Sequence, residues 1–189
     1  MDISRYIVKD KIWTLSNIFS FARLFMAVFL FYFIYTRHTY VATFLAILAV
    51  ISDYADGYAA RRRNEVTELG KILDPVADKV SVGLSAVALH LSYGLPLWMV
   101  IVIVGRDILI LIGSLFLMDK VKAVAASQMP GKIAVTVIAM LLLSYLFEFH
   151  NIKNILIILT ILAIIYSFTS YLIRFLRIMG RKTDKKEAL

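Results

Sequence analysis

Four aspartates are the residues in this chain best suited to chemistry. Asp53 and Asp56 are three residues apart. Asp74 and Asp78 are four residues apart, and all four fall within 26 residues. Residues at these spacings share one face of a helix, so each pair presents two carboxylates in one direction. The short polar segment between the pairs, RRRNEVTELG, predicts a tight turn that brings them together from two antiparallel helices.

Carboxylates gathered in an apolar environment need a compensating charge. Without one, mutual repulsion and desolvation would force these acids to take up protons. Mg²⁺, Mn²⁺ and Ca²⁺ prefer oxygen ligands, and two such ions can share four carboxylates while clamping a phosphoryl group in transfer. A proton or cation relay in a small transporter is the alternative. We expect a site for two divalent ions, with the ligands Asp53, Asp56, Asp74 and Asp78.

Six long apolar segments must position these acids. Of the 189 residues, 61% are hydrophobic, against about 45–50% in a soluble domain. A bilayer core takes about 20 apolar residues per helix, and open strands are excluded there because their backbone groups would lack partners. The sequence therefore predicts an all-α polytopic membrane protein with a bundle of six transmembrane helices. Their expected bounds are 15–35, 40–60, 72–91, 95–118, 133–149 and 155–178.

Basic residues are distributed unevenly between the links. The two termini and the links after the second and fourth segments carry 16 Lys and Arg, whereas the other links carry only Arg37 and Lys153. Positively charged links stay in the cytoplasm, so both termini and the acids are expected on the cytoplasmic side of a bacterial-type inner membrane. Residues 1–13 predict an amphipathic interfacial helix. Residues 14–180 would form the six-helix domain, and 181–189 a basic cytoplasmic tail.

The overall composition narrows the range of partners. A net charge of +8 suits membrane lipids and phosphate-bearing substrates. The basic residues follow the membrane topology and form no separate basic domain, so nucleic acid is not an expected partner. The chain has no cysteine, which excludes disulfides and thiolate metal sites.

The four acids belong to a longer pattern. The sequence reads Asp53-Tyr-Ala-Asp56-Gly57-Tyr-Ala-Ala60-Arg61, then, after eight residues, Gly70-x3-Asp74-x3-Asp78. It fits every fixed position of the signature D-x2-D-G-x2-A-R-x8-G-x3-D-x3-D, and the chain therefore resembles the CDP-alcohol phosphatidyltransferase family. The resemblance covers nearly the whole chain. It implies a transferase with two divalent ions, Mg²⁺ or Mn²⁺, that uses CDP-diacylglycerol, releases CMP and commonly forms a homodimer.

The resemblance also implies individual roles. The four aspartates would bind the metals, and Asp78 would in addition act as general base toward the acceptor hydroxyl. Residues implied to contact the nucleotide or its diphosphate are Asp56, Gly57, Ala60, Arg61 and Gly70.

The identity of the acceptor alcohol depends on other charges. Within the family, the chain length and the sequence Asp-Gly-Tyr-Ala-Ala-Arg most resemble bacterial enzymes that use sn-glycerol 3-phosphate. Arg106 and Lys132 are the candidates for binding its phosphate, because guanidinium and ammonium groups suit phosphate. Enzymes of that branch usually carry Arg-Glu where this chain has Arg106-Asp107. The sequence at this position instead resembles the branch that makes cardiolipin from a CDP-lipid. Serine and inositol phosphate remain alternative acceptors. A structural ion pair between Arg106 and Asp107 is one alternative. Since neighbouring helical residues point about 100° apart, however, the two are expected to serve different neighbours.

Overall fold

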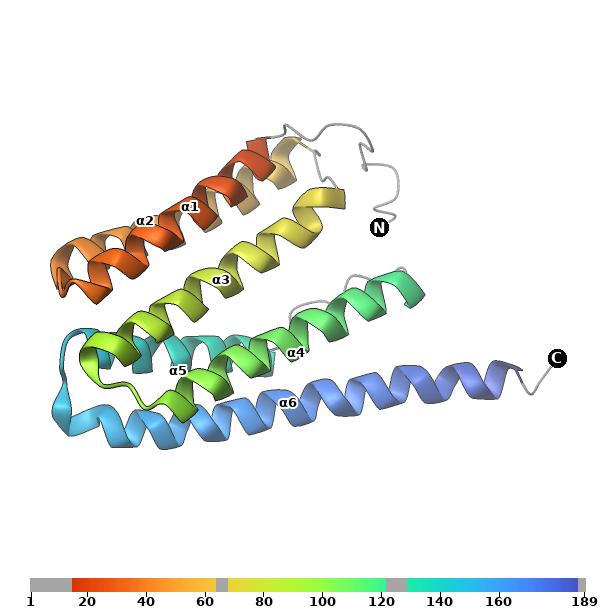
Figure 1. The fold of residues 1–189 in the computed structure, drawn as a ribbon. Helices are drawn as coiled ribbons and strands as arrows, with labels where there is room; N and C mark the ends of the chain where they lie inside the picture. Colours follow the sequence, from red (N-terminus) through yellow and green to blue (C-terminus); the bar gives the residue numbers. More distant parts are fainter. Residues whose placement is uncertain (1–14, 64–67, 122–128, 187–189) are drawn as a thin grey trace. The chain divides into compact units, whose positions relative to one another are not determined.

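A computed structural model describes residues 15–63, 68–121 and 129–186, with side chains at 18, 20–52, 73–113, 129–173 and 176. All regular structure in these ranges is α-helical. The helices are α1 (Leu15–Tyr35), α2 (Thr39–Arg63), α3 (Glu68–Tyr93), α4 (Leu97–Val121), α5 (Met129–Leu146) and α6 (His150–Lys186) (Figure 1). The prediction of an all-α chain is confirmed. The chain divides into two compact units, residues 1–115 and 116–189.

The helix bounds follow the predicted segments closely, and the differences have simple causes. α2 and α3 extend into the polar segment expected to be a turn, leaving only residues 64–67 between them. α5 begins before Pro130, because proline in the first turn removes no hydrogen bond that the helix would make. The predicted interfacial segment, residues 1–13, lies outside the described residues.

Within the part of the chain that the structure describes, two helices meet the requirements of a membrane span by length and composition. These are the stretches Met129–Leu146 in α5 and His150–Ile173 in α6. α1 and α2 contain shorter apolar stretches, Ser20–Tyr35 and Thr39–Ser52. Large apolar side chains are also exposed along the described helices, for example Phe25, Phe44, Ile101 and Ile158. Water solvates such surfaces poorly, whereas lipid tails match them.

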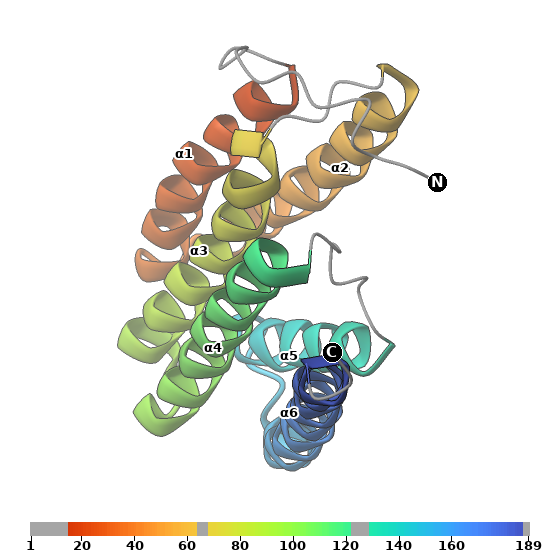
Figure 2. The same ribbon diagram turned by 90° about the vertical axis from the view of Figure 1, so that its right-hand side faces the viewer.

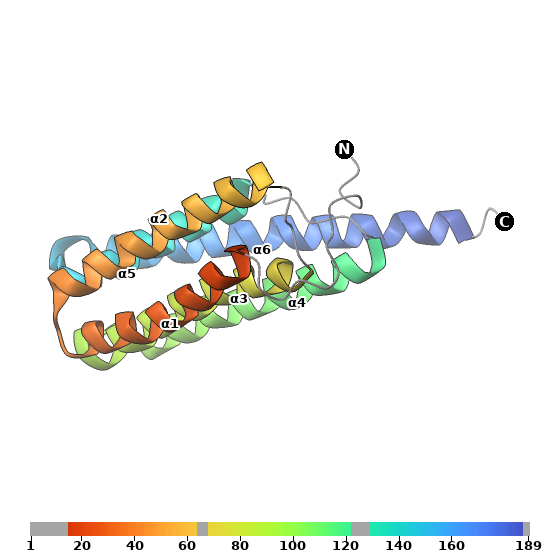
Figure 3. The ribbon, with the colours of Figure 1, turned by 90° about the horizontal axis from the view of Figure 1, so that it is seen from above.

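In the first unit, α1 is the central packing element. It packs against both α3 and α2, and α1 runs in the same direction as α3, with α2 and α4 running oppositely (Figures 1 and 2). Figure 3 looks along the row formed by α1, α3 and α4, with α2 to one side. Small buried residues such as Ala27, Ala42, Ala77 and Ala86 permit close helix approach. The start of α1, the end of α2 and the start of α3 therefore lie at one end of this unit.

The opposite end of the first unit is fixed by a defined turn. α1 ends with Arg37 in the left-handed region, φ 60°, and the amides of Arg37 and His38 bond the carbonyls of Ile34 and Phe33, a Schellman motif. The left-handed conformation costs a non-glycine residue about 1–2 kcal/mol. Contacts with the end of α3 offset this cost, since the Arg37 guanidinium lies 5.1 Å from the centre of the Tyr93 ring.

The second unit contains the antiparallel pair α5 and α6, which pack together. Five of the buried residues of α5 recur at alternating spacings of three and four, which produces one apolar seam. A Cβ added at Gly131 would lie 2.8 Å from the hydroxyl of Tyr171 on α6, so glycine allows the start of α5 to approach α6 closely. The seam residues are Gly131, Ala134, Ile138, Leu141 and Tyr145.

Candidate active site

Helix α3 carries two of the predicted metal ligands on one face. Asp74 and Asp78 are one helical turn apart, and α3 runs unbroken from Glu68 to Tyr93 through Pro75. Asp74 is half-buried, and its Oδ1 accepts a hydrogen bond from the hydroxyl of Ser20 on α1. Ser20 is only 1% exposed. The contact between α1 and α3 therefore fixes the orientation of Asp74.

Asp78 lies in a more open environment than Asp74. Its side chain is 55% exposed, and the ammonium of Lys79 lies 3.8 Å from Oδ2. A carboxylate in this setting remains accessible to a substrate while being held by its helix. Such accessibility is required of a group that exchanges a proton with an incoming alcohol.

Next to Asp78, a buried charge cluster joins α3 to α4. The ammonium of Lys79 lies 3.0 Å from Oδ1 of Asp107, and Nη1 of Arg106 lies 2.6 Å from the same oxygen. Both α4 side chains are nearly inaccessible, at 4% and 7% exposed. One carboxylate thus accepts from two cations.

The expectation that Arg106 and Asp107 serve different neighbours is wrong. Their Cα–Cβ bonds diverge by about 100°, but the arginine side chain is long enough to reach the adjacent carboxylate. In the buried environment the pair satisfies both charges, which would otherwise be costly to desolvate.

The other two predicted ligands are placed by their positions in α2. The side chains of Asp53 and Asp56 lie outside the described set, as do those of Gly57, Ala60, Arg61 and Gly70. Asp53 is ten residues before the end of α2, and Asp78 is ten after the start of α3. Asp56 and Asp74 are seven and six residues from the same ends. At about 1.5 Å per residue, these backbone positions lie roughly 10 and 15 Å along each helix from those ends.

The candidate acceptor residues belong to different units. Arg106 is buried in the first unit, within the α3–α4 cluster. Lys132 is exposed in the first turn of α5, in the second unit. A lysine in this exposed position can present its ammonium to a phosphate.

Sequence reasoning overlooked Ser20. Serine within an apolar helix is unremarkable alone, but Ser20 and Arg23 are three residues apart and both are buried. Two polar residues at helical spacing in an otherwise apolar run indicate a face directed toward another polar group. That pattern is the signal that could have identified Ser20.

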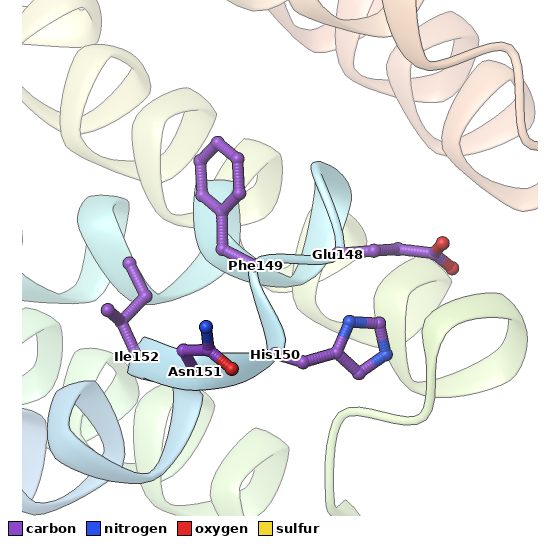
Figure 4. A pocket seen from close by; sticks show the side chains of 5 residues that line it. All are labelled: Glu148, Phe149, His150, Asn151 and Ile152. Carbon is purple, nitrogen blue, oxygen red and sulfur yellow. The ribbon is translucent and has the colours of Figure 1, made fainter.

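A shallow hollow at the turn between α5 and α6 does not resemble a reaction site. It is lined by five consecutive residues, Glu148 to Ile152. Figure 4 shows their side chains pointing in several directions, without converging on a common point. The hollow also lies at the end of α5 opposite Lys132.

Comparison with known proteins identifies the family. The sequence profile of the CDP-alcohol phosphatidyltransferases matches residues 13–169. The chain belongs to this family. It is therefore a transferase of phospholipid biosynthesis and a membrane protein, and its apolar helices fit that setting.

Three curated relatives illustrate the similarity. CDP-diacylglycerol–glycerol-3-phosphate 3-phosphatidyltransferase of Aquifex aeolicus is 31% identical, over 84% of this chain and 93% of the relative. The protein of the same name from Bacillus subtilis is 42% identical, over 47% of this chain and 46% of its own length. Cardiolipin synthase (CMP-forming) of Streptomyces coelicolor is 36% identical, over 54% of this chain and 51% of the relative. The matched region thus spans about half the length of the latter two relatives.

Members of this family generally use divalent metal ions, and the chemistry of the available donors fits such ions. Asp74 and Asp78 supply carboxylate oxygens from one helix face, and the hydroxyl of Ser20 donates a hydrogen bond to Asp74 Oδ1. Among the side chains that the structure describes, no three acidic or histidine groups gather into a complete site. The fit therefore depends on ligands from α2 in addition to those of α3.

Proposed function

We propose that this enzyme transfers the phosphatidyl group of CDP-diacylglycerol to sn-glycerol 3-phosphate, giving phosphatidylglycerophosphate and CMP. The observation that carries the proposal is the pair Asp74 and Asp78 on one face of α3. They lie at the same two levels, counted from the helix ends, as Asp56 and Asp53 on α2. Four carboxylates spaced in this way along two helices would suit a diphosphate donor bound with divalent ions.

In this proposal Asp53, Asp56, Asp74 and Asp78 hold two Mg²⁺ or Mn²⁺ ions. Such ions, when bound, neutralise charge on the diphosphate and on the leaving CMP. Ser20 holds Asp74 in the orientation needed for ligation, through its hydrogen bond to Oδ1. A ligand fixed in this way loses little conformational freedom when a cation binds.

The chemical step is an in-line displacement. The acceptor hydroxyl oxygen forms a bond to the phosphatidyl phosphorus of the donor. The bond between that phosphorus and the bridging oxygen breaks, and CMP leaves with the bridging oxygen. Asp78 accepts the hydroxyl proton, which its 55% exposed side chain is accessible enough to do.

The nucleotide is proposed to bind beside the acids. Gly57, Ala60 and Gly70 have little or no side-chain bulk, which permits a cytosine ring to approach the backbone. Arg61 would hold the diphosphate, with Asp56 close to it in sequence. Guanidinium matches the geometry of phosphate oxygens.

The choice of sn-glycerol 3-phosphate as acceptor is based on basic residues of this chain and on the names of two relatives. Lys132, whose side chain is exposed, is proposed to bind the phosphate of the alcohol. Arg106 is proposed separately as a phosphate-binding residue, a role that requires its guanidinium to leave the buried contact with Asp107. The relatives from Aquifex aeolicus and Bacillus subtilis carry glycerol 3-phosphate in their names.

Cardiolipin synthesis is the second candidate. The Streptomyces coelicolor relative is named for that reaction, and the Arg106–Asp107 pair favours it, because the sequence there resembles that branch. The acceptor would then be phosphatidylglycerol.

A CMP-release assay decides between these reactions. Purified protein with CDP-diacylglycerol and Mg²⁺ or Mn²⁺ is expected to release CMP fastest with sn-glycerol 3-phosphate. Faster release with phosphatidylglycerol would assign cardiolipin synthesis, and preference for serine or inositol phosphate would reject both assignments. Absence of release with every acceptor, in folded and metal-loaded protein, would favour a cation transporter.

We also propose a bundle of six spans, with both termini and the acids facing the cytoplasm. Support comes from the uneven distribution of Lys and Arg, 16 against 2. Residues 1–13 would lie in the interface, 14–180 would form the catalytic domain, and 181–189 would be a cytoplasmic tail. A homodimer surrounded by membrane lipids is proposed from the resemblance to the family, and the mass of the purified protein in nanodiscs tests it.

Single cysteines test the orientation without background, since the chain has no native cysteine. Asn64→Cys and Lys185→Cys are expected to react with membrane-impermeant thiol reagents only in inside-out vesicles. Asn151→Cys, at an exposed position after α5, is expected to react only in right-side-out vesicles. Labelling of position 64 from outside would overturn the orientation and the cytoplasmic location of the site.

A further inference from the structure

The charge cluster between α3 and α4 contains a residue that the proposed roles leave unexplained. Asp107 is buried, and a single oxygen, Oδ1, accepts from both Lys79 and Arg106. None of the metal, nucleotide or base roles requires Asp107. A buried carboxylate is costly unless its charge is matched, so its placement next to the site calls for a function.

Lys79 lies between two competing carboxylates. Its ammonium is 3.0 Å from Oδ1 of Asp107 and 3.8 Å from Oδ2 of Asp78. Attraction between opposite charges increases as the separation decreases, and it is strongest where water is excluded. Asp107 is 7% exposed and Asp78 is 55% exposed. The shorter distance and the lower exposure both favour Asp107 over Asp78 as the partner of Lys79.

We infer that Asp107 is a positioning residue, which limits the contact of Lys79 with Asp78 to an ion pair at 3.8 Å and so favours the binding of a divalent cation by Asp78. The inference rests on the proposed metal site. An ammonium paired with Asp78 would compete with a metal ion for the same oxygens and would raise the positive potential where a cation must bind. The cluster of Lys79, Arg106 and Asp107 has a net charge of +1. Without the Asp107 carboxylate, the two basic residues have a net charge of +2.

Removal of the Asp107 charge is expected to weaken metal binding. In Asp107→Asn, Lys79 would move toward Asp78, and affinity for Mn²⁺ should fall about 10- to 100-fold, as is typical when a group that orients a metal ligand is lost. Mn²⁺ titration of full-length protein in nanodiscs, followed by electron paramagnetic resonance, measures this without relying on turnover. Asp107→Glu keeps the charge and is expected to bind Mn²⁺ within about threefold of wild type, as the conservative rescue of this effect.

A second substitution separates this role from a simple packing role. Asp107→Asn with Lys79→Met removes the competing ammonium and should recover most of the lost Mn²⁺ affinity, although Arg106 has the same altered neighbour in both proteins. A double variant as weak as Asp107→Asn alone would overturn the inference.

Lys79→Met alone provides a test that does not depend on the folding of the Asp107 variants, since Arg106 keeps Asp107 as its partner. Its Mn²⁺ affinity is expected to equal or exceed that of wild type, and weaker binding would overturn the inference. A wild-type protein that binds Mn²⁺ but releases no CMP would instead contradict the proposed function, and the titrations would still decide the role of Asp107.

Discussion

Replacing Asp78 with asparagine is expected to reduce kcat for CMP release by about a thousandfold or more, while CDP-diacylglycerol still binds. Loss of a general base alone typically costs about 10²- to 10⁴-fold, and the variant also lacks one metal-ligating oxygen charge. The amide that replaces the carboxylate cannot accept the hydroxyl proton, but Asp53, Asp56 and Asp74 would still hold one ion and the nucleotide. Steady-state kinetics with sn-glycerol 3-phosphate, together with Mn²⁺ titration, would measure both effects.

Glu148→Gln is a suitable control for Asp78→Asn. Glu148 is an exposed carboxylate at the turn after α5, so its replacement removes one negative charge without altering α3. Its kcat is expected to remain within about twofold of wild type, as for a surface change away from the site. A kcat for Asp78→Asn comparable to that of the control would refute the base role.

Much of the fold could be predicted because long apolar helices have a strong and simple signal. α1 was predicted at the same bounds that the structure shows, 15–35. The ends of α2 and α3 were less predictable, because polar residues such as those after Arg61 fit a helix end as well as a turn. Hydropathy identifies where a helix is apolar, whereas hydrogen bonding decides where it ends.

The candidate site could be predicted only in part, for a related reason. Spacing along one helix places Asp74 and Asp78 on a shared face, but it does not show which group on another helix reaches them. The hydrogen bond from Ser20 depends on α1 packing against α3, and residues 54 apart give no local signal. Helix geometry did not predict the Arg106–Asp107 contact, because the contact depends on the flexibility of the arginine side chain.

The complementary prediction concerns Asp74, for which binding and turnover should be lost together. Asp74→Asn is expected to abolish detectable CMP release and to weaken Mn²⁺ binding by more than about 100-fold. The reason is that the substitution removes a charged, half-buried metal ligand. This differs from Asp78→Asn, in which donor binding should survive. Asp53→Asn is expected to behave like Asp74→Asn, because both are proposed to hold metal without taking part in proton transfer.

Ser20→Ala tests the same carboxylate through its partner on α1. The substitution leaves the charge of Asp74 intact but removes the hydrogen bond that orients it, so Mn²⁺ affinity and kcat should each fall about tenfold. Ser85→Ala is the matched control, because the Ser85 hydroxyl donates to a carbonyl of its own helix, that of Ser81. It should leave both quantities within about twofold of wild type, as expected away from the site. If Ser20→Ala bound Mn²⁺ as tightly as Ser85→Ala, Asp74 would be oriented by α3 alone, and the contribution of α1 to the metal site would have to be abandoned.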